Sequence, residues 1–337
     1  MNAFLNRISF ETLSFLRELI PAAVFSARAF GWCVLILTAA LIMRWGREKV
    51  TAAVEMRPSR GLVQICRQVC VTALKKNAVP QRARKKLYIA APLFALVFAL
   101  FFFFILPVNG RESPHYDFGL LYLTFVASCT TYAFIAGGWS GATRYGFFGA
   151  VRLIAQSLAC QLILAAVFVT VLMTAGTGDL YRIIQAQAGA WFAFVHFPLF
   201  VLYLLCVAML TAQAPFGAPK SERDLAGGVY AEYGGFPYLL FLIGEDVLTL
   251  LCAVSGAVLF LGGTLPVFGI DGVPAVVWLG GKTAAVVFVL TLMQTALPAW
   301  RTDRLMNMCF KAFLPLALAW LAGTAVVLYF VRQGGAG

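Results

Sequence analysis

The sequence has 337 residues, of which 61% are hydrophobic and only 12% are charged, and its formal net charge is +12. A soluble domain usually has about a quarter of its residues charged, so this composition excludes a soluble globular protein. Apolar runs reach the roughly 20 residues that cross a hydrocarbon layer as a helix. We therefore predict an all-α polytopic membrane protein, with residues 1–337 forming a single integral membrane domain.

Eight apolar windows are long enough to be transmembrane helices. They are about 21–44, 87–108, 117–136, 149–175, 190–211, 237–262, 273–298 and 312–331. The first window is the weakest, because Arg28 lies near its beginning. No apolar stretch with a cleavage site precedes it, so we expect no signal peptide.

The polar segment 45–86 follows the first window and is too long for a simple turn. Residues 44–86 contain twelve Lys and Arg but only two acids, Glu48 and Glu55. Within them, 61–77 places Leu62, Ile65 and Val69 largely on one side, a pattern typical of an amphipathic helix in the membrane interface. A basic, solvated loop is the alternative.

The basic residues also predict the orientation of the chain. Segments 44–86, 137–152, 212–236 and 299–311 together hold 19 of the 26 Lys and Arg residues, and eight spans place all four on one side. By the positive-inside rule this side is the cytoplasm or matrix, and both termini lie opposite. The net charge thus indicates topology and contact with anionic lipid such as cardiolipin, and no nucleic acid is expected as a partner.

Two further polar segments separate the later windows. Residues 179–191 are typical of a short surface helix on the opposite side. Residues 212–236 contain Pro215, Pro219 and five glycines. Such irregular backbone cannot face lipid, where each unpaired amide costs several kcal/mol. The aromatic residues Phe216, Tyr230 and Tyr233 favour a loop that lines a cavity or docks a partner over a bare hydrophilic loop.

Besides His196, three charged residues lie well inside the windows, away from their ends. Glu245 and Asp246 are in the sixth and Lys282 is in the seventh. A charge at the bilayer centre costs about 3 kcal/mol on insertion scales, so such residues indicate function. The alternative is a Lys–carboxylate pair that only fixes helix packing. We expect His196 to be a hydrogen-bonded packing residue, and the eight cysteines, without any C-x-x-C, to be structural.

Four ordered blocks give the sequence a family resemblance. "GGWSGATRYGFFGAVRLIAQS" (137–157) resembles G-W-S-x-x-x-K-Y-x-x-x-G-x-x-R-x-x-A-Q, and "APFGAPKSERDLAGGVYAEYGG" (214–235) is similar to A-P-F-D-L-P-E-x-E-S-E-L-V-x-G-x-x-x-E-Y-S-G. "FLIGEDV" (241–247) with "FLGG" (260–263), and the block from 282 to 318, continue the likeness. The chain resembles the quinone-site membrane subunit of respiratory complex I, called the H subunit in bacteria and NADH dehydrogenase chain one in mitochondria.

The resemblance implies a subunit of the enzyme NADH:quinone oxidoreductase that is not catalytic alone and has no redox centre of its own. It would form much of a quinone cavity and link quinone reduction to proton translocation. Quinone is then the substrate, while NADH, flavin and iron–sulfur clusters belong to partner subunits of the peripheral arm, and small membrane-arm subunits adjoin. No metal site is expected in this chain. We expect quinone-binding roles for Arg57, Glu222, Asp224, Tyr238, Phe241 and Arg301. We expect proton-relay roles for Arg152, Glu232, Glu245 and Asp246.

Seven positions depart from the family pattern. Gln161, Leu210, Gly217 and Lys220 stand where the family has acids, and Gln213, Gln294 and Ala299 stand where it has arginines. Neither leucine nor glutamine carries a titratable group. Either Glu245, Asp246 and Glu232 reroute the proton path with trapped water, or the coupling is altered.

Two other functions remain as alternatives. One is the equivalent subunit of a membrane-bound hydrogenase-type complex, which needs no long quinone cavity, and the other is a stand-alone secondary transporter. The divergence of the sequence favours the mitochondrial inner membrane, with the bacterial cytoplasmic membrane as the alternative.

Overall fold

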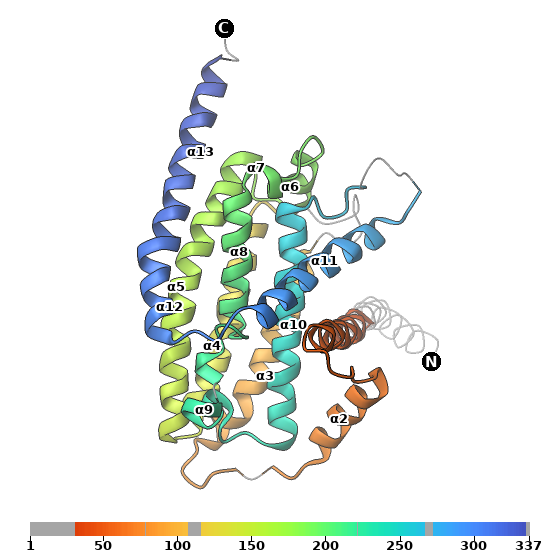
Figure 1. The fold of residues 1–337 in the computed structure, drawn as a ribbon, viewed down its shortest axis with the longest axis vertical. Coiled ribbons are helices and arrows are strands. Elements are labelled where there is room, and N and C mark those ends of the chain that lie inside the picture. Colours follow the sequence, from red (N-terminus) through yellow and green to blue (C-terminus); the bar gives the residue numbers. More distant parts are fainter. Residues whose placement is uncertain (1–30, 78, 107–115, 221, 267–271, 335–337) are drawn as a thin grey trace, which may run out of the picture.

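The computed structural model describes residues 31–77, 79–106, 116–220, 222–266 and 272–334, and every regular element in this part of the chain is helical. A helix over 31–54 is followed by α2 (Leu62–Leu74), α3 (Lys85–Phe101), α4 (Gly119–Ser140), α5 (Arg144–Ala175), α6 (Leu180–Ala186), α7 (Phe192–Val195), α8 (Phe197–Leu210), α9 (Glu222–Leu225), α10 (Gly235–Phe260), α11 (Ala275–Ala296), α12 (Thr302–Met308) and α13 (Leu314–Gly334). Figure 1 shows α3, α4, α5, α8 and α10 side by side along the long axis, while α11 is strongly inclined and helix 31–54 is seen nearly end-on.

Five helices of the described chain are long and apolar enough to span a membrane, so the protein is polytopic. They are α4, α5, α10, α11 and the continuous helical stretch Thr302–Val331. The other three predicted windows correspond to helix 31–54, to α3 with the 3-10 turn Phe102–Ile105, and to α7 with α8. Residues 21–30 of the first window lie outside the described residues.

The boundaries differ from the predicted windows at three places. The first helix continues to residue 54, so the first ten residues of the predicted polar segment 45–86 are helical. The fifth window is divided at His196, whose backbone is not helical, and α8 restarts with Pro198 in its first turn, where a missing N–H costs nothing. Residues 299–311, expected as a loop, are helical from Thr302 and pass through a π-helical turn at Cys309–Phe313.

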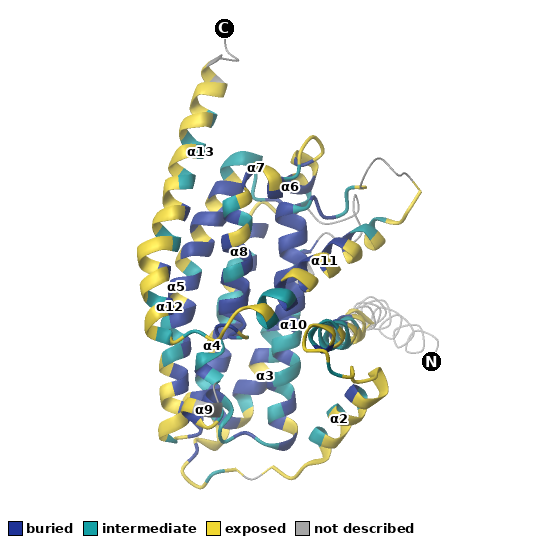
Figure 2. Cartoon of the chain, in the orientation of Figure 1, coloured by how far each residue is buried: buried dark blue, intermediate teal, exposed yellow. Residues whose placement is uncertain are grey.

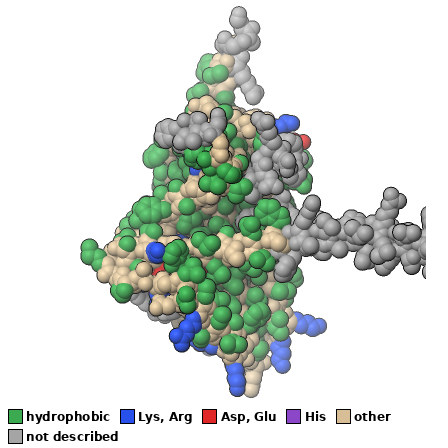
Figure 3. Space-filling model, turned by 90° about the vertical axis from the view of Figure 1, so that its right-hand side faces the viewer, with side chains coloured by type: hydrophobic (Ala, Val, Ile, Leu, Met, Phe, Trp, Pro, Cys, Tyr) green, Lys and Arg blue, Asp and Glu red, His purple; other side chains and the backbone are tan. Residues whose placement is uncertain are grey.

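The predicted surface segments form short helices. Residues 61–77 contain α2, in which Ile65 is buried while Val63 and Leu74 are exposed. Residues 179–191 contain α6, where the Asp179 side chain caps the helix by accepting a hydrogen bond from Tyr181 N. In Figure 1, α2 and α9 lie at the lower end of the bundle, whereas α6, α7 and the C-terminus lie at the upper end. Lys and Arg side chains gather at that lower end in Figure 3.

The buried core centres on α10. About 72% of its most apolar stretch is buried, against 6% for Thr302–Val331, and Figure 2 shows the same contrast. The segment 212–236 folds back against α5 through a glycine. A Cβ at Gly149 would lie 2.7 Å from Val229 N, closer than real contacts allow. Gln156 of α5 donates hydrogen bonds to Phe216 O of the same segment (3.1 Å) and to Met209 O at the end of α8 (2.7 Å).

Candidate functional site

Glu245, near the lower end of α10, is held by two residues of the segment 212–236. Its Oε1 accepts hydrogen bonds from Lys220 Nζ and from Tyr230 OH. Lys220 also donates to Thr211 O at 2.9 Å. The side chains of Lys220 and Glu245 are only 16% and 13% exposed, so the ion pair is largely withdrawn from solvent. The segment 212–236 and Glu245 of α10, both predicted from the sequence to be functional, are therefore in direct contact.

Asp246 has different partners on a different element. Its Oδ2 lies 3.0 Å from Arg44 Nη1 and its Oδ1 lies 3.7 Å from Arg47 Nη1, and both arginines belong to helix 31–54. Consecutive residues of a helix point about 100° apart, so the two carboxylates face different neighbouring elements. In these contacts Glu245 and Asp246 share no partner.

Two glutamines complete this group around Arg47. Arg47 Nη2 donates to Gln213 Oε1 (3.0 Å) and to Gln294 Oε1 (3.1 Å), and Gln294 Nε2 donates to Gln213 Oε1. Gln213 Nε2 then donates to Thr249 Oγ1 at 2.9 Å. The resemblance would place arginines at positions 213 and 294, but here two glutamine amides surround the single guanidinium of Arg47. Buried polar groups that satisfy one another in this way avoid the cost of an unmade hydrogen bond.

We call this set of residues the polar cluster. It consists of Arg44, Arg47, Gln213, Lys220, Tyr230, Glu245, Asp246, Thr249 and Gln294. It joins helix 31–54, the segment 212–236, α10 and α11. Of its members, only Glu245 and Asp246 were predicted as site residues. One signal in the sequence could have identified Lys220 as well. The family has an acid at this position, and the reversed charge indicates a carboxylate partner such as Glu245.

Lys282 does not pair with either carboxylate, so the alternative interpretation of a Lys–carboxylate pair that only fixes helix packing does not hold for this residue. Its Nζ donates to Leu265 O at 2.8 Å and lies 5.2 Å from the centre of the Trp191 ring. Both contacts are at the end of α10 and α11 away from the segment 212–236. A backbone carbonyl and an aromatic face are favourable neighbours for an ammonium group. Lys282 therefore fixes the upper loops.

An apolar cavity of about 560 Å³ lies between helix 31–54, α10 and α11. Its walls include Trp32, Leu35, Ile42, Leu250, Val254, Ala284 and Phe288. Arg47 also lines it, so the cavity reaches the polar cluster. The size and apolar walls suit an elongated hydrophobic ligand, and the few polar groups at one end would orient its head.

Tyr238 and Phe241, predicted to wall a quinone channel, pack elsewhere. Phe241 is fully buried, and a Cβ at Gly137 would lie 2.5 Å from its ring. The Tyr230 ring lies 5.3 Å from the ring of Phe241 and 5.8 Å from that of Tyr238, centre to centre. Neither residue belongs to the lining of the 560 Å³ cavity. They anchor the segment 212–236 on α10.

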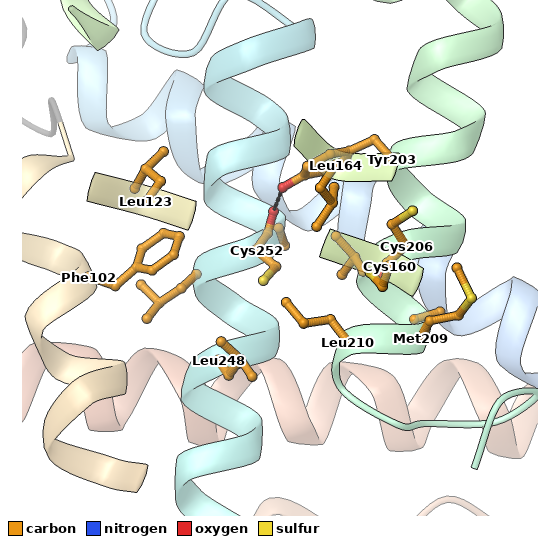
Figure 4. Packing of buried hydrophobic residues seen from close by; sticks show 14 of the residues in the cluster. Phe102, Leu123, Cys160, Leu164, Tyr203, Cys206, Met209, Leu210, Leu248 and Cys252 are labelled. Atoms are coloured by element: carbon orange, nitrogen blue, oxygen red, sulfur yellow. Dashed lines mark hydrogen bonds between the residues drawn. The ribbon is translucent and has the colours of Figure 1, made fainter. Parts of the chain in front are cut away.

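A smaller cavity of about 180 Å³ is lined by both Gln161 and Leu210, the two positions where the resemblance expects glutamates. Figure 4 shows the packed side chains around it, with Leu210 and Cys252 among them. Tyr203 OH and Ser255 Oγ form a hydrogen bond of 2.7 Å there, whereas Gln161 Nε2 has no partner in the described structure. Its lining, as far as the chain is described, includes no carboxylate.

Three acids of the segment 212–236 were predicted site residues. Asp224 Oδ2 lies 3.8 Å from Arg152 Nη1, so two predicted residues come together at a partly exposed position. The backbone oxygen of Glu232 accepts a hydrogen bond from Tyr88 OH at 2.9 Å. Glu222 begins α9, and its side chain lies outside the described structure.

The remaining predicted arginines lie at element ends. Arg57 follows helix 31–54 and forms ion pairs with Glu48 (2.8 Å) and Glu55. Arg301 is the exposed N-cap of α12. The neighbouring Trp300 N donates to Pro215 O at 3.0 Å, which ties this end to the segment 212–236. Arg57 and Glu232, predicted as quinone-binding and proton-relay residues, have separate partners.

The fold and the polar cluster define a multi-pass, all-helical membrane protein with buried ion pairs beside an apolar cavity. No group of three His, Cys, Asp or Glu side chains in the described ranges is placed to hold a metal ion. The chain belongs to the NADH dehydrogenase family, whose model matches residues 27–325.

Relatives with curated names are similar over almost their whole length. The H subunit of NADH-quinone oxidoreductase from Rhodobacter capsulatus is 33% identical over 323 residues, which cover 92% of this chain and 93% of the relative. The H subunits from Parvibaculum lavamentivorans and Agrobacterium fabrum are 32% and 31% identical, with 92% and 94% of this chain covered and 95% and 97% of the relatives. The resemblance inferred from the four blocks is confirmed.

Proposed function

We propose that this chain is the membrane subunit of a proton-translocating NADH:quinone oxidoreductase that forms much of the quinone cavity and links quinone reduction to proton movement. One observation carries the proposal. Arg47 lines the apolar cavity and also belongs to the polar cluster that contains both buried carboxylates. A ligand in this cavity would therefore touch the ionisable network directly.

The chemistry of a quinone fits this arrangement. Its isoprenoid tail is apolar and suits the walls formed by helix 31–54, α10 and α11. Its two carbonyl oxygens accept hydrogen bonds, which a guanidinium such as Arg47 donates. Reduction to the hydroquinone takes up two electrons and two protons. In this proposal the electrons come from redox groups of partner subunits, and this chain supplies binding and charge.

The polar cluster offers a way to link proton uptake to a change of shape. Glu245 as an anion attracts Lys220 from the segment 212–236. Adding a proton to Glu245 removes that attraction and leaves Lys220 without its counter-ion, which is unfavourable for a largely buried charge. The position of the loop and the proton on Glu245 therefore depend on each other. Gln161 and Leu210 carry no proton, so Glu245 and Asp246 have the central role.

The cavity is tested with a pair of adjacent alanines on α11. Both alanines are exposed, but Ala284 lines the cavity whereas Ala285 is absent from its lining. In the intact complex, Ala284→Trp should raise the KM for a long-tailed quinone about tenfold or more, while Ala285→Trp should leave it unchanged. NADH oxidation by an artificial hydrophilic acceptor should be normal in both. Equal behaviour of the two variants with quinone would refute the assignment of this cavity.

The relatives also bear on the location and the alternatives. The named H subunits are bacterial, which favours the bacterial cytoplasmic membrane over the mitochondrial inner membrane expected from sequence divergence. A large apolar cavity beside ionisable groups favours a quinone over the hydrogenase-type alternative, which needs none. Other subunits of the same complex, in the peripheral and membrane arms, are the proposed partners.

A further inference from the structure

A third cavity, of about 670 Å³, opens at the lower end of the bundle, where the segment before α3 meets the turn between α4 and α5. Its main walls are the side chains of Arg82, Arg84, Arg144, Trp139, Phe147 and Phe148. We call it the arginine–aromatic pocket. It contains no residue of the polar cluster or of the 560 Å³ cavity, so it is a separate feature of the molecule.

Two of the arginines, Arg82 and Arg84, lie in the segment before α3, and the fold brings them together with Arg144 at the start of α5. Arg84 N donates a hydrogen bond to Ser140 O at 3.1 Å, which fixes the segment before α3 against the end of α4. No ion pair involves Arg82, Arg84 or Arg144 within the described ranges, whereas Arg44, Arg57 and Arg152 each have a carboxylate within 4 Å. No acid of the described chain lines the pocket. Three like charges around one hollow favour an anion there, and guanidinium groups suit phosphate oxygens.

The aromatic walls indicate what is attached to that anion. Trp139, Phe147 and Phe148 are 53%, 44% and 56% exposed, which is costly in water. They lie where α4 ends and α5 begins, the two adjacent membrane-spanning helices. Aromatic side chains are enriched at this depth, where head groups meet acyl chains. The ligand should therefore join a phosphate to an apolar chain.

We propose that the arginine–aromatic pocket binds one anionic phospholipid, with its phosphate among Arg82, Arg84 and Arg144 and its acyl chains along Trp139, Phe147 and Phe148. A free phosphate would gain nothing from the aromatic walls. An acidic protein segment would need no contact at the level of the acyl chains. The proposal is independent of the quinone cavity and of the role of Glu245.

The test uses the intact complex in lipid nanodiscs containing spin-labelled phosphatidylglycerol. The variant Arg82→Gln/Arg84→Gln/Arg144→Gln is compared with Arg67→Gln/Lys75→Gln/Lys76→Gln, which removes the same charge from exposed positions outside the pocket. Losing one basic contact near a membrane surface weakens binding about fivefold, and losing three weakens it about a hundredfold. The first variant should therefore bind the labelled lipid about a hundredfold more weakly than the second, with no difference for phosphatidylcholine. Equal binding by the two variants would overturn the proposal.

Two further measurements separate the other occupants. Excess inorganic phosphate should not displace the labelled lipid, and displacement would identify a simple anion site instead. Trp139→Ala keeps all three charges and should still weaken lipid binding. This variant tests the proposal even if the triple variant does not assemble. If the triple variant retains its lipid but loses a peripheral-arm subunit, the pocket is a protein interface and the proposal is wrong.

Discussion

Lys220 and Glu245 form an ion pair between a loop and a membrane helix, and Tyr230 of the same loop donates to the same carboxylate oxygen. The family resemblance places an acid at position 220, which would repel Glu245. In this chain the charge is reversed and the contact is attractive. The segment 212–236 is therefore fastened to α10 at the acid that we assign to proton coupling.

Removing the lysine should destabilise the protein. Lys220→Met leaves Glu245 largely buried without its counter-ion, and breaking such a pair costs about 3–5 kcal/mol. Thermal unfolding of the purified complex should shift to a lower temperature. Lys220→Arg keeps the charge and should retain most of the stability. A normal unfolding temperature for Lys220→Met would show that the pair contributes little.

Removing the proton site should separate electron transfer from proton transfer. Glu245→Gln keeps the shape and the hydrogen-bonding capacity but cannot ionise. We expect quinone reduction to continue, with fewer protons moved per electron pair, measured in proteoliposomes with a pH-sensitive dye. If the variant assembles and reduces quinone at the wild-type proton ratio, Glu245 is structural and the coupling mechanism fails.

The site between Gln213 and Gln294 should tolerate only one guanidinium, which in this chain is that of Arg47. Gln294→Arg brings a second positive charge to within hydrogen-bonding distance of the Arg47 position, where the present Oε1 is 3.1 Å from Arg47 Nη2. Repulsion in a site of low dielectric should reduce assembly of the complex. Adding Arg47→Gln leaves one guanidinium among positions 47, 213 and 294 and should recover most of the loss, as measured by the yield of assembled complex. Failure of the double variant to improve on Gln294→Arg would contradict this view.

A hydrogen bond between Trp320 and His196 should stabilise the attachment of α13. Trp320 Nε1 donates to His196 Nδ1 at 3.1 Å, so His196 Nε2 carries the proton and donates to Thr174 Oγ1, also at 3.1 Å. Trp320→Phe leaves the imidazole acceptor unpaired and should lower stability by about 1–3 kcal/mol. Tyr329→Phe, which removes an exposed hydrogen bond of the same helix, is the control. Equal unfolding temperatures for the two variants would show that the bond to His196 is dispensable.

The same bond bears out the sequence prediction for His196 as a hydrogen-bonded packing residue. A histidine in an apolar window with no nearby candidate ligand in the sequence is most simply explained by local hydrogen bonding. Its position before Pro198 also explains why the window breaks there, because proline starts α8 afresh. The break depends on neighbouring residues, so the sequence was sufficient for it, whereas the hydrogen-bond partners Thr174 and Trp320 lie 22 and 124 residues away and only the structure identifies them.

Composition and local pattern were sufficient to predict the membrane helices, the surface helix α2 and the family. Continuous apolar windows predicted the membrane helices, the spacing of Leu62 and Ile65 predicted α2, and ordered motifs identified the family. These inferences rest on hydrophobic burial and on periodicity, which neighbouring residues encode. The pairs Lys220–Glu245 and Arg44–Asp246 join positions 25 and 202 residues apart. No local pattern encodes such contacts. Only the packing of helix 31–54 and the segment 212–236 against α10 decided that Glu245 meets Lys220, while Lys282 lies at the other end of the bundle.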